Sequence, residues 1–136
     1  MDAKKDDIIT EDNQKKVIRM AKELAVKTKA VIVITGETDL VTDGETVYFI
    51  KNGVPEMARI TGCGCMLDGV IAGFIGANQG NILEATVTAV SAMGICGEYA
   101  RENAKGTGTL KVHLIDAMSN IDETWMERSN QIESRS

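Results

Sequence analysis

The chain has 136 residues, of which 43% are apolar, and this length and composition suit one compact domain with a single hydrophobic core. Its 20 acidic residues exceed the 15 basic ones, the net charge is −5, and no Lys/Arg cluster larger than a dipeptide occurs. Nucleic-acid binders normally carry a basic patch, so that class of function is not expected.

The sequence gives no sign of export or of a membrane span. Residues 1–16 are charged and lack the apolar core of a secretory signal. The most apolar stretch, residues 69–83, is interrupted by a polar Asn-Gln-Gly-Asn segment and is too short to cross a bilayer. We therefore expect a soluble, cytoplasmic protein. Its three cysteines, at 63, 65 and 96, are then expected to be free thiols.

An α/β pattern opens the chain. Residues 11–28 are predicted to form an amphipathic helix that Thr10 can cap. The apolar face of this helix consists of Val17, Met20, Ala21 and Leu24. Residues 30–35 form a continuous β-branched run, typical of a strand buried on both faces in a parallel sheet.

Two turn dipeptides follow the predicted strand. The Asp-Gly of residues 42–45 and the Asn-Gly of residues 51–54 both supply the positive φ of a tight turn. They bracket the strand-like "TVYFI", so residues 39–60 are predicted to form a small antiparallel meander. Pro55 falls just after the second turn, where its missing N–H does least harm.

The second half of the chain is helical. Residues 64–77 are apolar almost all round, which predicts a buried helix. Asn81 can cap a second long helix over residues 82–103, and a third is predicted after the Gly-Thr-Gly of residues 106–108. The second helix carries a stripe of mostly small residues, and the third an apolar face: Ala85, Ala89, Met93, Cys96, Gly97 and Ala100, then Leu110, Leu114, Ala117 and Ile121.

The domain organisation is simple. No internal repeat or low-complexity segment occurs, and residues 1–127 are expected to form one folded unit. Residues 128–136 are polar, and we expect them to be a disordered tail.

The segment "ITGCGCM", residues 60–66, is the most unusual part of the sequence. Cys63 and Cys65 lie two apart, with only Cys96 and His113 elsewhere as soft metal ligands. Zinc sites usually use paired C-x-x-C or C-x-x-H spacings, so a metal clip is disfavoured, and a redox pair at this spacing is weak as well. Cysteines that act as small buried hydrophobes at a helix entrance remain an open interpretation. The lone histidine is more typical of a hydrogen-bonded, partly buried side chain than of a catalyst.

An anion site explains more of the same residues together. Gly62 and Gly64 free the backbone to expose N–H groups where a helix begins, and the helix adds partial positive charge there. Such a nest suits the charge on a transferring phosphoryl group, and Cys65 would sit in the first helical turn. No lysine follows, so the segment is not a Walker loop. The residues alone indicate an anion site beside a polarised thiol.

A family resemblance rests on "VIVITGETDLVTDGETVYFIKNG", "ITGCGCML", the Ala/Gly-rich helix and "GTGTLKVHLIDAM". Over residues 16–124 the chain resembles the C-terminal half of hydroxyethylthiazole kinase, a thiamine-salvage member of the ribokinase-like superfamily. Ribokinase-like enzymes generally carry G-x-G-D in this loop, whereas the thiazole kinases place a cysteine there, which is Cys65 here. The resemblance implies a partial ribokinase-like three-layer α/β fold, with a parallel strand, a small antiparallel meander and three long helices.

The resemblance also implies an activity. The family uses ATP, with Mg2+, to phosphorylate the hydroxyl of 4-methyl-5-(2-hydroxyethyl)thiazole. By resemblance, Cys65 would orient or deprotonate the attacking hydroxyl. The amides of Gly62, Cys63 and Gly64 would form the anion hole, and Gly62 also matches a position against the thiazole. Cys63 departs mildly from the family, which more often has alanine or threonine there.

Nucleotide contacts are implied at two threonines. Thr35, at the end of the predicted strand, matches a nucleotide-contacting threonine, and Thr61 is expected near the phosphates. From the residues alone, Thr35 is equally well interpreted as the cap of the following turn. Asp39 and Asp43 have the chemistry of magnesium ligands, but the turn accounts for Asp43, and no metal ligand is assigned.

The chain is about half as long as we expect for an intact kinase of this family. The other half would supply the first strands, most of the thiazole pocket, acidic residues near magnesium and a nucleotide-binding arginine. The expected partner is a complementary N-terminal half, or further copies of the chain, because the family forms trimers with sites at subunit interfaces. One alternative stays open, an inactive nucleotide-binding or oligomerising fragment. Another ribokinase-like small-molecule kinase, such as a pyrimidine-alcohol kinase, is disfavoured because those enzymes carry a carboxylate or a differently placed cysteine. An upstream reading frame encoding the other half would favour the kinase over the fragment.

Overall fold

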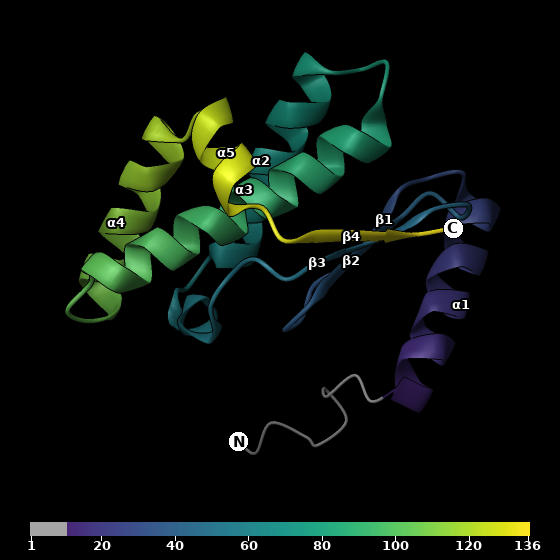
Figure 1. Cartoon of the computed structure of the whole chain (residues 1–136), viewed down its shortest axis with the longest axis horizontal. Coiled ribbons are helices and arrows are strands. Elements are labelled where there is room, and N and C mark those ends of the chain that lie inside the picture. The colour runs from purple at the N-terminus through teal and green to yellow at the C-terminus, as the bar shows by residue number, and fades with distance from the viewer. Residues whose placement is uncertain (1–10) are drawn as a thin grey trace.

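A computed structural model describes residues 11–136 as a small antiparallel sheet with helices on both sides (Figure 1). The elements are α1 Glu11–Thr28, β1 Ile32–Ile34, β2 Asp39–Thr42, β3 Val47–Ile50, the 3-10 helix η2 Pro55–Arg59, α2 Cys63–Ala77, α3 Ile82–Asn103, α4 Thr107–Asn120, α5 Glu123–Ser129 and β4 Ile132–Arg135. The predicted α/β class and the four helices expected from the sequence are confirmed, whereas α5 was not predicted. The proposed Thr10 cap lies outside the described residues.

The sheet has the order β1-β2-β3-β4, and all three pairings are antiparallel. Val33 of β1 lies opposite Val41 of β2, which lies opposite Tyr48 of β3. The prediction of a parallel strand is therefore wrong for the described residues. β1 is a half-buried edge strand, and a parallel neighbour would have to pair along its free side. A β-branched run reports burial, but it does not specify the direction of the neighbouring strand.

The two predicted turns behave differently. The first joins β2 to β3, and its Asp43 Oδ1 accepts the N–H groups of Glu45 and Thr46 at 2.9 Å each. After the second, the chain leaves the sheet and Pro55–Arg59 forms η2, so the meander ends at Ile50 and not at residue 60. Proline near the start of a helical turn has a favourable φ and loses no hydrogen bond, which favours η2 over a further strand.

The last strand comes from the residues predicted to be a disordered tail. Ile132–Arg135 pairs with β3, with Ile132 opposite Ile50, and the Lys51 Nζ lies 2.5 Å from the Glu133 carboxylate. Four polar-rich residues are too few for a strand signal in the sequence. The edge of β3 offers unpaired backbone groups, and pairing with them orders the tail as β4.

The sheet lies between two helical layers, as the three-layer expectation requires. Leu40 and Phe49 point to one face, where they pack with Ala21 of α1. Val41 and its neighbours point to the other face, where they pack with Val90 of α3. This alternation follows from the period of two in a strand. Figure 1 shows α1 on one side of the sheet and α2, α3 and α4 on the other.

The centre of the helical layer is α3, which contacts α2, α4, α5, β2 and β3. Its predicted cap is present, because Asn81 Oδ1 accepts the Glu84 N–H at 3.3 Å. The predicted stripe is buried along its whole length, and the α4 residues Leu110, Leu114 and Ala117 are buried as well. Small side chains let the helices approach closely, so the stripe forms the core of this layer.

Two helices are less buried than the sequence predicts. None of the 15 residues of α2 is fully buried, because its described neighbours cover only one side. On α1, Ala21 is buried, whereas Met20 and Leu24 are 56% and 47% exposed. Within residues 11–136, no helix combines the length and the apolarity needed to cross a membrane.

Candidate active site

The glycine-cysteine segment forms a sharp entry into α2. Ile60, 4% exposed, anchors the chain in the core, and the exposed Thr61 follows it. Gly62 is the N-cap of α2 with φ 87° and ψ 7°, a left-handed conformation that residues with a Cβ rarely adopt. A Cβ placed on Gly62 would meet no atom within 4 Å. The backbone angle, not crowding, is therefore what requires glycine here.

The first turn of α2 presents free donors. The Cys63 N–H donates to Ile60 O at 3.3 Å, and the Met66 N–H donates to Gly62 O at 2.9 Å. The N–H groups of Gly64 and Cys65 have no acceptor in the described part of the chain, and α2 has neither a side-chain cap nor an acidic residue in its first turn. Free N–H groups at the positive end of a helix dipole are suited to bind an anion.

The three cysteines are free thiols in different surroundings. Cys65 is exposed in the first turn of α2. Cys63 is half-buried and packs against the cluster that contains Ile60 and Cys96, and burial raises its pKa. Cys96 is buried, and its desolvation raises the pKa to about 11. Cys65 is thus the only one of the three cysteines that is exposed to solvent.

Thr35 and Thr61 are both exposed at ends of secondary-structure elements. Thr35 directly follows β1, and the Gly36 N–H beside it donates to Asp39 Oδ1 at 2.9 Å. Asp39, not Thr35, therefore caps this turn. Burial of Asp39 raises the pKa of its carboxyl, although the hydrogen bond from Gly36 opposes the shift.

The structure brings these predicted residues together only in part. Thr61 and Cys65 belong to one turn of chain, whereas Thr35 lies at the end of the sheet. The two parts share a core: Val33 of β1 and Leu67 of α2 pack against the same cluster, which includes Val90. No hydrogen bond among the described residues joins Thr35 to the Gly62–Cys65 segment.

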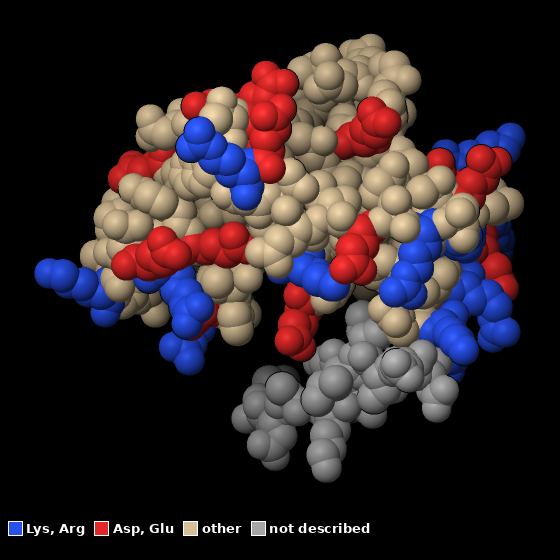
Figure 2. Space-filling model, viewed as in Figure 1, with Lys and Arg blue, Asp and Glu red and all other residues tan. Residues whose placement is uncertain are grey.

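The described residues do not fit a magnesium ion. Residues 11–136 contain no group of three or more His, Cys, Asp or Glu side chains that could hold a metal. Asp39 bonds the Gly36 amide, and Asp43 bonds its own turn, whose N–H groups lower the pKa of its carboxyl. The segment 60–77 contains no lysine or arginine and one aspartate, so an anion there would depend on backbone N–H groups. Figure 2 shows the tip formed by the end of α2 and the turn after it as an uncharged surface.

Sequence reasoning missed a buried polar cluster beside the route to this loop. Asn52 is 4% exposed, and its Oδ1 accepts Ser91 Oγ–H at 3.0 Å and the Gln131 N–H at 2.8 Å. Its Nδ2 donates to Glu98 Oε1 at 3.2 Å and to Ser129 O at 2.9 Å. In the sequence, Asn52-Gly53 indicates only a turn. Its role as a buried hydrogen-bonding side chain is not visible there, because its partners are 39 to 79 residues away. No local signal could have found them.

A cavity of about 430 Å³ lies between α2, α3 and α4. Its lining includes Val70, Phe74, Met93, Cys96 and Ile121, and none of its lining side chains is charged. An apolar cavity of this kind does not stabilise phosphate, and it is lined by α2 from Val70 onward, beyond the turn that holds Cys65. The candidate active site is therefore the N-terminal end of α2.

Comparisons with known proteins found similar sequences and a similar fold. A model of the hydroxyethylthiazole kinase family matches residues 3–124. Hydroxyethylthiazole kinase 1 of Clostridium botulinum (strain Loch Maree / Type A3) is 43% identical over 128 residues, which are 94% of this chain and 47% of that protein. Hydroxyethylthiazole kinase of Clostridium acetobutylicum is 39% identical over an alignment that covers 98% of this chain and 50% of that protein. A solved hydroxyethylthiazole kinase structure from Pyrococcus horikoshii OT3 matches with a TM-score of 0.85 and 27% identity, covering 93% of this chain and 49% of that one. The chain thus spans about half the length of the curated relatives that it matches.

Proposed function

This chain belongs to the hydroxyethylthiazole kinase family, and we propose that it supplies the phosphoryl-transfer loop for ATP-dependent phosphorylation of 4-methyl-5-(2-hydroxyethyl)thiazole in thiamine biosynthesis. The observation that carries the proposal is the start of α2. A left-handed Gly62, two free N–H groups and an exposed cysteine occur there together. Because the chain spans half of its relatives, we propose the activity for an assembly with a complementary N-terminal half.

The anion hole would hold the phosphoryl group as charge develops on it. The N–H groups of Gly62 and Gly64 support this role, since they have no acceptor among the described residues, and the Cys65 N–H is free in the same way and would add to the hole. The Cys63 N–H would join them only when its long bond to Ile60 O opens. Gly62 would lie against the thiazole as well as shape the turn. ATP supplies the γ-phosphoryl group.

Cys65 would act on the substrate alcohol. Its exposed sulfur would orient the hydroxyl or accept its proton while the alcohol oxygen forms a bond to the γ-phosphorus. The bond from that phosphorus to the bridging oxygen breaks, and ADP leaves with the electron pair. Thr35 would contact the nucleotide and Thr61 the phosphates, and their exposure supports both assignments. No magnesium ligand is proposed in this chain; we expect the ligands in the N-terminal half.

The proposal is tested by thiazole-dependent ADP formation with Mg-ATP. The purified chain is assayed alone and after mixing with the N-terminal half of a homologous thiazole kinase. We expect activity in the mixture. Activity of the chain alone would mean that it rebuilds a site by self-association, such as the homotrimer of the family. If the two halves are shown to bind each other and neither assay gives thiazole-dependent ADP formation, the proposal is contradicted.

A second candidate function is an inactive nucleotide-binding or oligomerising fragment. The incompletely covered apolar surface of α2 and the absence of a metal cluster among residues 11–136 favour it. ATP binding by the chain without turnover in any mixture would support this alternative.

A further inference from the structure

The segment that leads from β3 to the loop, residues 51–62, contains no strand and only the short helix η2. Its first part is held by one carboxylate. Glu98 Oε1 accepts the Gly53 N–H at 2.9 Å and an Asn52 Nδ2 hydrogen at 3.2 Å. Ser91 Oγ donates to the other side of the Asn52 amide at 3.0 Å. Four bonds saturate this buried amide, so its position is fixed from all sides.

Two glycines of α3 make room for the same segment. A Cβ on Gly94 would lie 2.6 Å from the carbonyl carbon of Asn52, and a Cβ on Gly97 would lie 2.1 Å from Met57 Sδ. The Gly94 contact is with backbone, so this position requires glycine for the close approach. The Gly97 contact is with the flexible Met57 side chain, which would have to move to admit a larger residue. The surface of α3 is hollowed where residues 52–57 cross it.

The last part of the segment is held on the same helix. Arg101 Nε lies 3.2 Å from Glu56 Oε1, and Ile60 packs in the core cluster with Cys96 and Ala100. Among the α3 positions that touch the segment, 91, 94, 98 and 101 are spaced by three and four residues and so share one face of the helix. Two residues after Ile60 the chain reaches Gly62 and α2.

We infer that Glu98, acting through Asn52 and Gly53, is a positioning residue for the Gly62–Cys65 segment. One face of α3 serves as a template that fixes the 51–60 connection and thereby the place of the free N–H groups and of Cys65. The proposed function enters this inference only as the role of the positioned loop in phosphoryl transfer. The positioning of residues 51–60 by α3 is argued from their contacts alone.

The test is amide hydrogen exchange of the full chain, read out peptide by peptide, with no nucleotide or thiazole present. Glu98→Ala removes the acceptor of two N–H groups, and we expect exchange over residues 53–65 to accelerate about tenfold while exchange in α4 stays unchanged. Glu98→Gln keeps an oxygen that can accept both hydrogens, and we expect it to return exchange to within about twofold of the unmodified chain.

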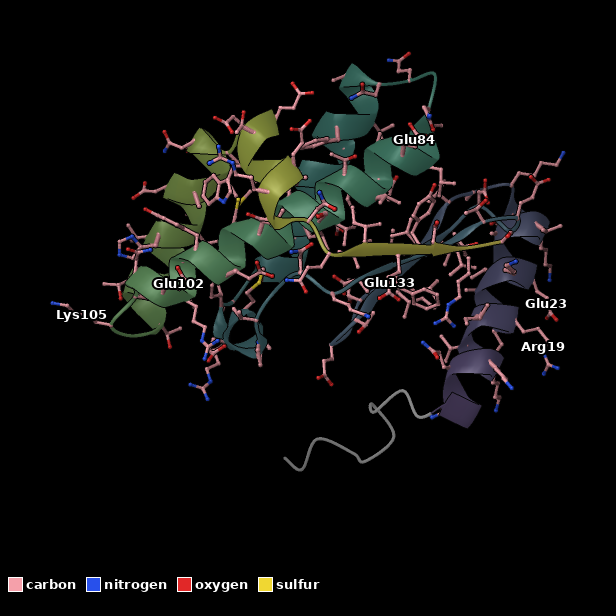
Figure 3. The ribbon with its side chains drawn as sticks, in the orientation of Figure 1. Arg19, Glu23, Glu84, Glu102, Lys105 and Glu133 are labelled. Carbon is pink, nitrogen blue, oxygen red and sulfur yellow. The ribbon has the colours of Figure 1, made fainter. Side chains whose placement is uncertain are left out.

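Glu102→Ala is the matched control. Glu102, labelled in Figure 3, lies one turn further along α3 and is exposed, and no hydrogen bond or ion pair among the described residues joins it to residues 51–60, so its truncation should leave residues 53–65 unaffected. If Glu98→Ala does not fold, Ser91→Ala replaces it, and a smaller acceleration of about threefold is expected in the same peptides.

Unchanged exchange over residues 53–65 in the folded variants would overturn the inference. Acceleration shared equally with α4 would also overturn it, because Glu98 would then serve only global stability. The hydrogen-exchange results do not depend on kinase activity. A negative kinase assay would therefore count against the proposed function without affecting the positioning role of Glu98.

Discussion

At the residue scale, two glycines of the loop meet different needs. Gly62 has a φ of 87°, whereas Gly64 lies inside α2 with a φ outside the left-handed region. A Cβ at either position would meet no atom within 4 Å. The two residues therefore differ in backbone conformation alone, which makes them a matched pair for substitution.

We expect Gly62→Ala to destabilise the chain by about 1 kcal/mol, because alanine is strained in the left-handed region. Gly64→Ala should be neutral or stabilise by up to about 1 kcal/mol, since alanine is the better helix former. Urea unfolding of both variants checks this. Equal stability of the two would contradict the left-handed turn at Gly62.

The Asp43 turn gives a pH-dependent expectation. Hydrogen bonds from the Thr46 and Glu45 N–H groups lower the pKa of the Asp43 carboxyl in the folded chain. A lowered folded pKa contributes stability above the unfolded pKa, and this contribution is lost as the pH falls through the folded value. Asp43→Asn should therefore lower stability at pH 7, and its difference from the unmodified chain should shrink toward pH 3.

Urea unfolding at both pH values measures this difference. Glu37→Gln, which removes an exposed carboxylate from the loop between β1 and β2, is the control for the loss of one negative charge. A stability difference between Asp43→Asn and the unmodified chain that grows as the pH falls would contradict the lowered pKa of Asp43.

Residue roles with local causes were predictable from the sequence, and those with distant causes were not. The Asp43 turn and the Asn81 cap depend on residues two or three positions away, so pattern reasoning found both. Asn52 shows the opposite case, because its partners Ser91 and Gln131 meet it only in the folded chain. The Gly62 turn and the exposed thiol of Cys65 follow from the loop itself, whereas their place relative to Thr35 depends on the sheet.

At the element scale, α3 is a template for everything that packs on it. Gly94→Ala would place a methyl group 2.6 Å from the backbone of Asn52, which cannot move without breaking its four bonds. We expect a loss of about 2–3 kcal/mol in unfolding free energy. Gly69→Ala on α2, where a Cβ meets open space, is the control and should cost nothing. A Gly94→Ala chain as stable as the control would refute the close approach.

Helix positions were predictable because the period of 3.6 and the capping residues are local signals. The burial of α2 was not predictable. An apolar pattern indicates that a helix packs against other elements, but not whether those elements belong to the same chain. The same holds for β1, whose β-branched residues indicate a strand but leave its direction undetermined. β4 was missed because its order comes from the edge of β3 and not from its own four residues.

At the scale of the whole molecule, the sheet has two outer strands, β1 and β4. β1 is half-buried and wholly β-branched, whereas β4 is mostly exposed and polar. An apolar edge strand invites further pairing, and a polar one resists it. Because the chain spans about half the length of its relatives, we expect the strands of an N-terminal half to pair with the free edge of β1.

Hydrogen exchange in the mixture tests this expectation. Addition of the N-terminal half of a homologous kinase should slow exchange in residues 31–35 at least about tenfold, because new strand pairing protects backbone N–H groups. Residues 132–135 are the internal control and should not change. Slower exchange in β4 and not in β1 would show that the N-terminal half pairs with β4, which would contradict this expectation.

We propose that the Gly62–Cys65 segment carries out phosphoryl transfer, and the sharpest test is the turnover of Cys65→Ala in the enzyme reconstituted with an N-terminal half. We expect kcat to fall by about 100-fold or more while ATP affinity stays within about twofold, because the thiol acts at the alcohol and not at the nucleotide. Cys63→Ala, whose side chain packs into the core, is the control and should keep near-normal turnover. Full turnover by Cys65→Ala, or an equal loss of ATP affinity and rate, would contradict the account.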